Sequence, residues 1–441
     1  MDLLLLKYKD SAYRLLQKYK DRDFIYYIPF ILLSLDARLS YFFYLLRPGN
    51  SLPQSEDSQW YIDYAYALMN HFNIGLHMND IMYLGYNVLL ALLLAAVKDP
   101  VSVIFIQAVV ASLSIILVFK IARMLFNRST AILAAYFYYD LWDMTLWSTY
   151  ILTETFFITL LLLNVYFLLM ALKFNKSVYK ILFVASGAYM LIFRPTGLVS
   201  FLFILIYIVI NLDRAVITGF LRKYGWIIGG SIASMIAALA FVYSLGKLDP
   251  LLASMQFNAK KVLYNIYANG WIYDKPSPYD HKFKPNYTIN IGNSLIASFI
   301  VNNWDNVLVI YGKRTIAFLG RWVWQTDLHT KRGVLRIVHQ LLPTLLFVTG
   351  TVAAIAGKRF RKASVLWLII LAVYLFCIVF FIDFMYRYKA PGMPFIVIVV
   401  AYGANRVIYW ALSIANKYSG MLLYGTRKPA KKNTDRYSCI Q

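Results

Sequence analysis

Cysteine is scarce in this chain: the 441 residues contain only Cys377, inside an apolar run, and Cys439, near the C-terminus. Two cysteines in these positions exclude a disulfide framework. The sequence also has no HExxH, CxxC, Walker A or glycine-rich dinucleotide pattern, and it has no internal repeat. The common metalloprotease, thiol-redox, nucleotide-binding and solenoid classes are therefore not indicated.

Acidic residues are also few, with 21 Asp and Glu against 44 Lys and Arg, which gives a formal charge of +23. A basic excess can indicate nucleic-acid binding. Here, however, the basic residues lie mainly between apolar runs, as membrane-topology signals do. Hydrophobic residues make up 60% of the chain and the mean hydropathy is +0.58. These values predict a polytopic membrane protein with no nucleic-acid partner.

Apolar segments long enough to cross a lipid bilayer predict an all-α fold with about ten transmembrane helices. The predicted spans are residues 24–46, 101–119, 130–148, 153–171, 178–193, 197–211, 225–244, 337–356, 364–382 and 392–414. The fifth and sixth spans are short and are joined by Arg194-Pro195-Thr196, so these two could equally form a bent re-entrant hairpin.

Lysine and arginine in the short connections set the predicted orientation of the chain. One set of segments carries 25 basic residues, and we expect it to face the cytoplasm: the N-terminus, 120–128, 173–180, 214–223, 358–362 and the C-terminal tail. Segments 47–100 and 245–336 are then extracytoplasmic, with interfacial helices. The sequence thus predicts a basic interfacial segment at 1–23, in place of a cleavable signal peptide, a membrane domain at 24–414 and a basic cytoplasmic tail at 415–441. We expect a multi-pass protein of the inner (plasma) membrane.

An acidic pair, Glu56-Asp57, follows the first span on the face where positive charge is sparse. Polar residues gather at this face, whereas a secondary transporter commonly has two halves with matching broken helices and a midplane site. We therefore favour an enzyme that works at the outer leaflet, with the acidic pair, Asp57 or else Glu56, as a candidate for its chemistry. A purely structural role for the pair stays open. Asp63, off the helical face of Asp57, is expected to be structural.

Two further acidic residues are candidates for binding a substrate. Asp80 lies in a second interfacial segment and could hold an acceptor or a cation. His71 and His77 lie near it, so a metal site is a weaker alternative. Glu154 could accept hydrogen bonds from a sugar at the outer mouth of the bundle. Its alternative role is to stabilise the first turn of a helix, with Thr153 as the N-cap.

Arginines are the candidates for binding a phosphate, because a guanidinium can offer it two parallel hydrogen bonds. Arg387 lies at a membrane edge between Tyr388 and Tyr386, which is itself a further candidate for binding the substrate, and Arg194 lies between two short spans. The alternative role for both is snorkelling toward lipid headgroups. Arg321 belongs to a basic, aromatic segment typical of an interfacial helix that could grip a lipid.

Four sequence neighbourhoods follow one another in a distinctive order. They are Asp36-Ala37-Arg38 with Glu56-Asp57-Ser58 and Tyr61; Gly85-Tyr86 before an apolar run; residues 152–157 (LTETFF) with 194–197 (RPTG); and residues 386–394 (YRYKAPGMP). Over roughly residues 24–412, this order resembles the membrane-embedded C-type (GT-C fold) glycosyltransferases. The specific likeness is to the group of the protein O-mannosyltransferases and the aminoarabinose-to-lipid-A transferases. Asn87 stands where that group often has a proline.

The resemblance implies a polyprenyl-phosphate sugar donor, hexosyl or pentosyl, and transfer with inversion at the extracytoplasmic membrane face. The acceptor would be a membrane glycolipid, a glycan polymer or a protein. A phosphodiester-linked sugar already has a good leaving group, so one carboxylate can suffice as the base; the family pattern gives this role to Asp57. No cofactor or metal is expected, because a monophosphate-linked donor carries little charge. A flippase or transporter of a lipid-linked sugar is the alternative function, and a non-catalytic subunit of a polymer assembly complex is a third.

Overall fold

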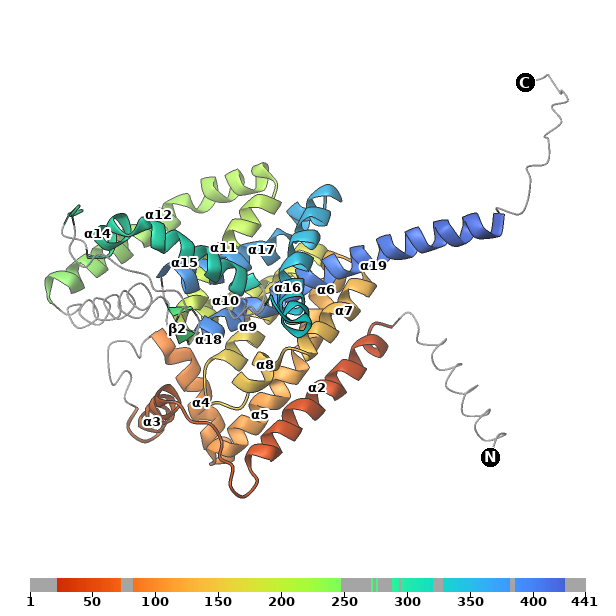
Figure 1. Cartoon of the computed structure of the whole chain (residues 1–441). Coiled ribbons are helices and arrows are strands. Elements are labelled where there is room, and N and C mark those ends of the chain that lie inside the picture. The colour runs from red at the N-terminus through yellow and green to blue at the C-terminus, as the bar shows by residue number, and fades with distance from the viewer. Residues whose placement is uncertain are drawn as a thin grey trace, which may run out of the picture.

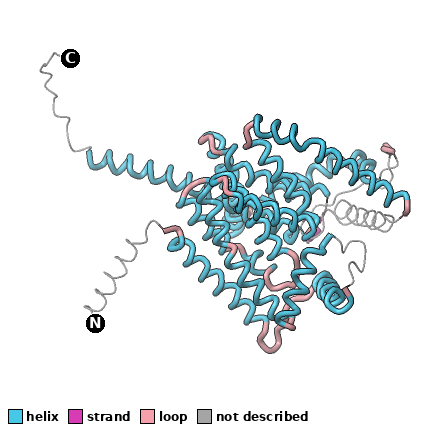
Figure 2. The backbone as a smooth tube through the Cα atoms, turned by 180° about the vertical axis from the view of Figure 1, so that it is seen from behind, coloured by secondary structure: helices cyan, strands magenta, loops and turns pink. Residues whose placement is uncertain are grey.

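The computed structural model describes residues 22–72, 82–246, 271–272, 275–276, 288–292, 295–319, 328–380 and 385–424, apart from some side chains within the helices. These residues form a helical bundle (Figure 1) whose long helices are joined mostly by short loops (Figure 2). The strands in the described ranges are the two-residue β1 (Trp271–Ile272) and β2 (Lys275–Pro276), which pair antiparallel. Apart from these four residues, the regular elements in the described ranges are helices, so the predicted all-helical class holds.

Along the chain, Arg194 separates the helices of the described ranges into two groups. The first group is α2 (Phe24–Leu45), α3 (Glu56–His71), α4 (Leu84–Val97), α5 (Pro100–Leu113), α6 (Ile115–Leu125), α7 (Arg128–Tyr139), α8 (Trp142–Trp147), α9 (Glu154–Phe174) and α10 (Ser177–Phe193). The second group is α11 (Pro195–Asn211), α12 (Arg214–Ser244), α14 (Leu295–Asn302), α15 (Trp304–Leu319), α16 (Lys331–Ala356), α17 (Phe360–Tyr374), α18 (Met385–Lys389) and α19 (Met393–Tyr424).

Several helices are long and apolar enough to cross a membrane. Within the described ranges there are six: Phe24–Leu45, Pro100–Leu125, Glu154–Phe174, Lys331–Ala356, Phe360–Cys377 and Arg387–Asn416. The bent pair Pro195–Asn211 and Arg214–Ile227 would make a seventh span, and three shorter apolar helices remain. The protein is thus multi-pass, while the total of about ten spans stays a prediction.

The predicted span at 130–148 is not a single helix. α7 ends at Tyr139, the backbone of Leu141 is extended (φ −72°, ψ 100°), and α8 covers only six residues. The break follows Asp140, whose side chain is exposed. Asp143 then lies in the first turn of α8, where the helix dipole favours a carboxylate. Two acidic residues in an aromatic run therefore divide a segment that hydropathy alone reads as continuous.

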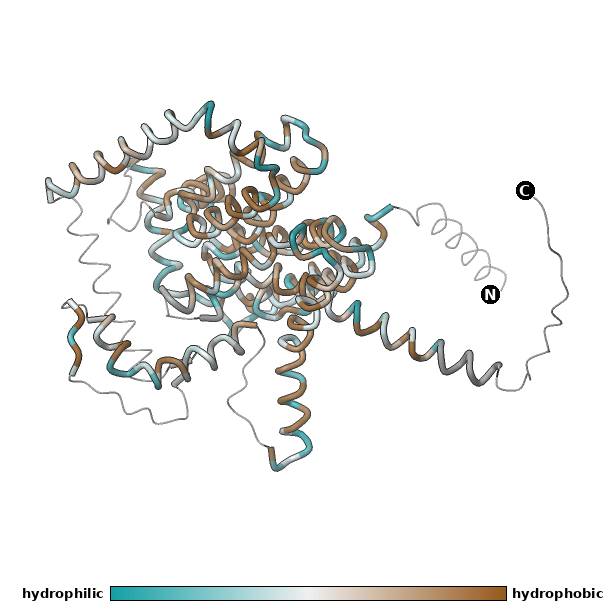
Figure 3. The backbone as a smooth tube through the Cα atoms, turned by 90° about the horizontal axis from the view of Figure 1, so that it is seen from above, coloured by the Kyte–Doolittle hydropathy of each residue, from teal (hydrophilic) through white to brown (hydrophobic). Residues whose placement is uncertain are grey.

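α9 runs through the middle of the bundle and packs against α5, α6, α10 and α11. In Figure 3 the bundle helices are mostly hydrophobic, as a chain in a lipid bilayer requires. α9 begins at buried Glu154 and carries exposed Lys173 near its end. At 1.5 Å per residue these two lie roughly 28 Å apart along the helix, close to the thickness of the hydrocarbon layer. The two ends of α9 thus mark two opposite faces of the bundle.

α16 and α19 cross in close contact because glycine lies at the crossing on both helices. A Cβ atom at Gly403 would lie 2.0 Å from the carbonyl oxygen of Leu346, and one at Gly350 would lie 2.3 Å from that of Val399. Small residues at such a crossing let the backbones of membrane helices approach. Beyond Asn405, α19 leaves the bundle and projects outward (Figure 1), and its described side chains are mostly exposed.

Candidate active site

Glu154 is the centre of a buried ion cluster at the start of α9. Its side chain is 0% exposed, and its Oε1 accepts hydrogen bonds from Nη1 of Arg194 at 2.8 Å and from Nε of Arg387 at 2.7 Å. Thr153 does not cap the helix through its side chain; its Oγ1 donates instead to Oε2 of Glu154 at 3.4 Å. The role of a simple first-turn carboxylate therefore does not describe Glu154, which binds two guanidinium groups at once.

Arg194 is held in place by the tight connection between α10 and α11. The residue has an extended backbone, as the residue before a proline prefers, and Pro195 opens α11. A Cβ atom at Gly197 would lie 2.2 Å from the carbonyl oxygen of Met190, so only glycine permits this close turn. The guanidinium is buried 5.2 Å from the ring centre of Tyr388. Burial alone would lower the pKa of Arg194, but Glu154 raises it overall, so the side chain stays charged.

Arg387 comes from α18, just before the last long helix, and joins two carboxylates. Besides its bond to Glu154, it donates from Nη1 to Oδ2 of Asp57. The cluster therefore contains two arginines and two carboxylates and is formally neutral. Buried charges persist only when they are paired in this way. Four segments that are far apart in the sequence are thereby held at one end of the bundle.

Asp57 lies at the accessible edge of the cluster. It belongs to the first turn of α3, which begins after Ser55, whose hydroxyl caps the helix by accepting from the backbone N–H of Ser58 at 3.1 Å. The Asp57 side chain is 50% exposed, while Glu154 behind it is fully buried. Glu56 is exposed and makes no ion pair with any residue that the structure describes. Of the acidic pair, Asp57 is thus the residue that the fold connects to the arginines.

A group of aromatic side chains lines the same end of the bundle. The ring of Tyr61 lies 4.9 Å from that of Tyr86 and 5.7 Å from that of Tyr83, measured between centroids. Burial, followed by the neighbouring Tyr83, raises the pKa of Tyr61 well above its ordinary value, although Arg387 opposes this. Burial likewise raises the pKa of Tyr83 against the effect of Arg194 and Arg387. Both phenols therefore stay neutral, and the negative charge of the site rests on the carboxylates.

Tyr83 and Tyr388 are site residues that the sequence reasoning did not select. Tyr388 packs beside both guanidinium groups, 5.2 Å from Arg194 and 5.9 Å from Arg387. Lys389 follows it, is buried, and lies 5.9 Å from the ring centre of Phe318 on α15. The signal was the density of tyrosine around Gly85 and Arg387, but tyrosine is equally common at membrane interfaces.

Several predicted site residues cannot be placed in this cluster. Asp80 and Arg321 lie outside the described residues, and Tyr386 is a backbone position in α18 whose side chain is not described. Asp63 accepts a hydrogen bond from Gln59 on the same helix at 2.8 Å, in keeping with the structural role expected of it. The described ranges, which include His71 but not His77, hold no group of three His, Cys, Asp or Glu side chains arranged to bind a metal.

Comparison with known proteins finds a family model that matches part of the chain. Residues 78–243 match the family model described as dolichyl-phosphate-mannose-protein mannosyltransferase. The matched segment contains Glu154 and Arg194, while Asp57 and Arg387 flank it on either side. No curated protein matches the chain significantly.

The match covers less than half of the chain, and it confirms the resemblance seen in the sequence to membrane glycosyltransferases of the C-type fold. The family also implies the donor class, a sugar linked to a polyprenyl phosphate.

Proposed function

We propose that the protein is an inverting glycosyltransferase that moves one sugar from a polyprenyl-phosphate carrier to an acceptor at the extracytoplasmic face of the inner (plasma) membrane. The acceptor is a glycolipid, a glycan polymer or a protein hydroxyl. The observation that carries this proposal is the position of Asp57: it is half exposed, yet an arginine connects it to a buried anion. This arrangement offers one accessible base beside cations suited to a phosphate.

Asp57 acts as the general base in a single displacement. Its carboxylate takes the proton of the acceptor hydroxyl as the oxygen attacks the anomeric carbon from the face opposite the phosphate. The bond between that carbon and the phosphate oxygen breaks, and the polyprenyl phosphate leaves with the electron pair. One inversion follows from one displacement. The phosphate is already a good leaving group, so the reaction needs no general acid.

Arg387 and Arg194 bind the donor phosphate and stabilise the charge that develops on it. In the ion cluster Arg387 uses Nε for Glu154 and Nη1 for Asp57. An arriving phosphate can replace Asp57 at Nη1 while Glu154 keeps the guanidinium in place. The exchange would release the Asp57 carboxylate next to the donor. The base and the arginine that binds the leaving phosphate would then become available together. Such preorganised charge is a large term in enzyme catalysis.

Transfer can be tested directly with purified protein in detergent. The protein is mixed with a radiolabelled polyprenyl-phosphate sugar and with glycolipid, peptide and glycan acceptors in turn, and both labelled product and released carrier are measured. We expect time-dependent loss of the donor's sugar–phosphate bond, with a product of inverted anomeric configuration. A flippase or transporter would relocate intact donor across proteoliposomes and break no bond. Relocation with all donor intact would contradict the proposal.

A further inference from the structure

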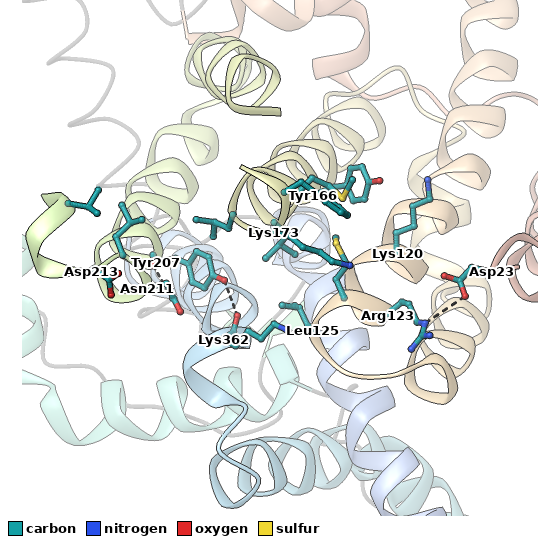
Figure 4. A pocket seen from close by; sticks show the side chains of 17 residues that line it. Asp23, Lys120, Arg123, Leu125, Tyr166, Lys173, Tyr207, Asn211, Asp213 and Lys362 are labelled. Atoms are coloured by element: carbon teal, nitrogen blue, oxygen red, sulfur yellow. Dashed lines mark hydrogen bonds and ion pairs between the residues drawn. The ribbon is translucent and has the colours of Figure 1, made fainter. Parts of the chain in front are cut away.

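A second site lies at the opposite end of the bundle from the ion cluster. A cavity of about 900 Å³ opens there between the ends of α6, α9, α11, α12 and α17 (Figure 4). Lys173 of α9 lines it, about five turns along the helix from Glu154. The other basic lining residues are Lys120, Arg123 and Lys362. Segments predicted to be cytoplasmic connections are thus collected around one opening.

The cavity has a surplus of positive charge. Four basic side chains and two carboxylates, Asp23 and Asp213, line it, so its formal charge is +2. Asp23 is already shared by Arg123 at 3.7 Å and by Arg128, outside the cavity, at 3.1 Å. Considering the part of the chain that the structure describes, Lys120, Lys173 and Lys362 have no carboxylate within ion-pairing distance. These three ammonium groups are therefore available to bind an anion.

Hydrogen bonds between helices hold the cavity wall in shape. The hydroxyl of Tyr207 on α11 donates to the carbonyl oxygen of Lys362 on α17 at 2.9 Å (Figure 4). Next to this bond, Arg361 donates to the carbonyl oxygen of Ile210 from both Nε at 3.1 Å and Nη2 at 2.8 Å. Within α11, Nδ2 of Asn211 donates to the carbonyl oxygen of Tyr207, one turn earlier, at 3.0 Å. The opening is part of the packed fold and is not a gap left by a loop.

Apart from Tyr166, Tyr207 and Asn211, the remaining lining is apolar and includes Leu125, Leu169, Leu172, Met124 and Met170. Cations around an apolar interior match a molecule with an anionic head and a hydrocarbon body. We propose that this cavity binds the phosphate-bearing headgroup of an anionic membrane lipid, with the lysines on the phosphate and the first part of the acyl chains against the leucines. Basic pockets between membrane helices recognise such headgroups by the same chemistry. The proposal is independent of the transfer reaction.

The test measures lipid binding by the full-length protein in detergent. Phosphatidylglycerol, phosphatidylcholine and inorganic phosphate are titrated separately, and bound lipid is counted by native mass spectrometry alongside the melting temperature. The test variant combines Lys120→Gln, Lys173→Gln and Lys362→Gln. The control combines Lys176→Gln, Lys180→Gln and Lys223→Gln, which removes the same charge from exposed positions that do not line the cavity.

We expect phosphatidylglycerol to bind and to raise the melting temperature, with its apparent affinity falling roughly tenfold or more in the test variant and little in the control. Phosphatidylcholine should bind far more weakly. An equal loss in both variants would mean that only general surface charge matters and would overturn the site. Stabilisation by inorganic phosphate equal to that by phosphatidylglycerol would overturn the assignment to a lipid. Lys362→Gln alone, at an exposed position, should still weaken binding, which guards against a folding defect in the triple variant.

Discussion

Nε of Arg387 lies 2.7 Å from Oε1 of Glu154, although 233 residues separate the two in sequence. The same oxygen accepts from Arg194, and the same guanidinium reaches Asp57. A single buried carboxylate thereby fixes the mutual positions of α3, α9, α18 and the turn between α10 and α11. The fold and the proposed chemistry share this one group.

Removing the charge of Glu154 should therefore damage the structure before it affects the chemistry. Glu154→Gln leaves two buried arginines with too little negative charge, and breaking such a buried pair typically costs about 3–5 kcal/mol. We expect a clearly lowered melting temperature in detergent. Glu56→Gln is the matched control, because Glu56 is exposed and makes no ion pair with any residue that the structure describes. This variant should melt as the parent protein does. Equal melting temperatures for both variants would contradict the anchoring role of Glu154.

Arg387→Lys tests the ligand of the donor phosphate. Lysine keeps the charge but loses the planar fork, so it cannot hold Glu154 and a phosphate in the same geometry. Donor affinity, measured by direct binding of a polyprenyl-phosphate sugar, should fall by roughly tenfold. Arg406→Lys, at an exposed position on α19, should bind the donor normally. Unchanged donor binding in Arg387→Ala would instead move the role to Arg194.

Gly403→Ala tests the crossing of α16 and α19. Alanine normally stabilises a helix relative to glycine by about 1 kcal/mol. Here its Cβ would lie 2.0 Å from the carbonyl oxygen of Leu346, so overpacking should dominate and cost about 1–3 kcal/mol. Gly225→Ala, where no heavy atom lies within 4 Å of the new Cβ, should leave the melting temperature unchanged or slightly higher. A rise of the same size in both variants would show that the helices do not cross this closely.

The orientation in the membrane can be tested by cysteine labelling of intact cells. With Cys439 replaced by serine and Cys377 buried, single cysteines are introduced as Gln54→Cys and Lys176→Cys, both at exposed positions. A membrane-impermeant maleimide should label the first and reach the second only after the cells are opened. The reverse pattern would put the ion cluster on the cytoplasmic side and would contradict the proposed site of transfer.

Sequence reasoning located the residues that carry charge but not the partners that they would find. Glu154, Arg194 and Arg387 stood out because each is an ionisable residue at the end of an apolar segment on the predicted outer face, with chemistry suited to a sugar or a phosphate. Nothing in local sequence, however, showed that one carboxylate would bind both arginines, because that depends on how α9, α10 and α18 pack. The alternative with Thr153 as a capping residue was reasonable locally, and tertiary contacts replaced it.

Membrane spans were predicted best where hydropathy was uniform and worst where polar residues interrupt it. The predicted span at 153–171 corresponds closely to α9, whereas the one at 130–148 is divided after Asp140. A hydropathy window averages over such a break, but aspartate competes with the helical backbone for hydrogen bonds and favours a turn over a helix interior. The basic cavity likewise could not be predicted from the sequence. Its lysines come from separate connections, and each connection by itself indicates only the membrane topology.

The most direct measurement is the transfer rate of Asp57→Asn at saturating donor and acceptor. Asparagine keeps the size of the side chain and can still accept a hydrogen bond from Arg387, but it cannot take the acceptor's proton. We expect the turnover rate to fall by about 10²-fold or more with donor binding and monodispersity in detergent preserved. Asp63→Asn, on the same helix and bonded only to Gln59 in the described contacts, is the control and should retain the parent rate. A folded Asp57→Asn protein that transfers sugar at a near-normal rate would contradict the assignment of Asp57 as the base.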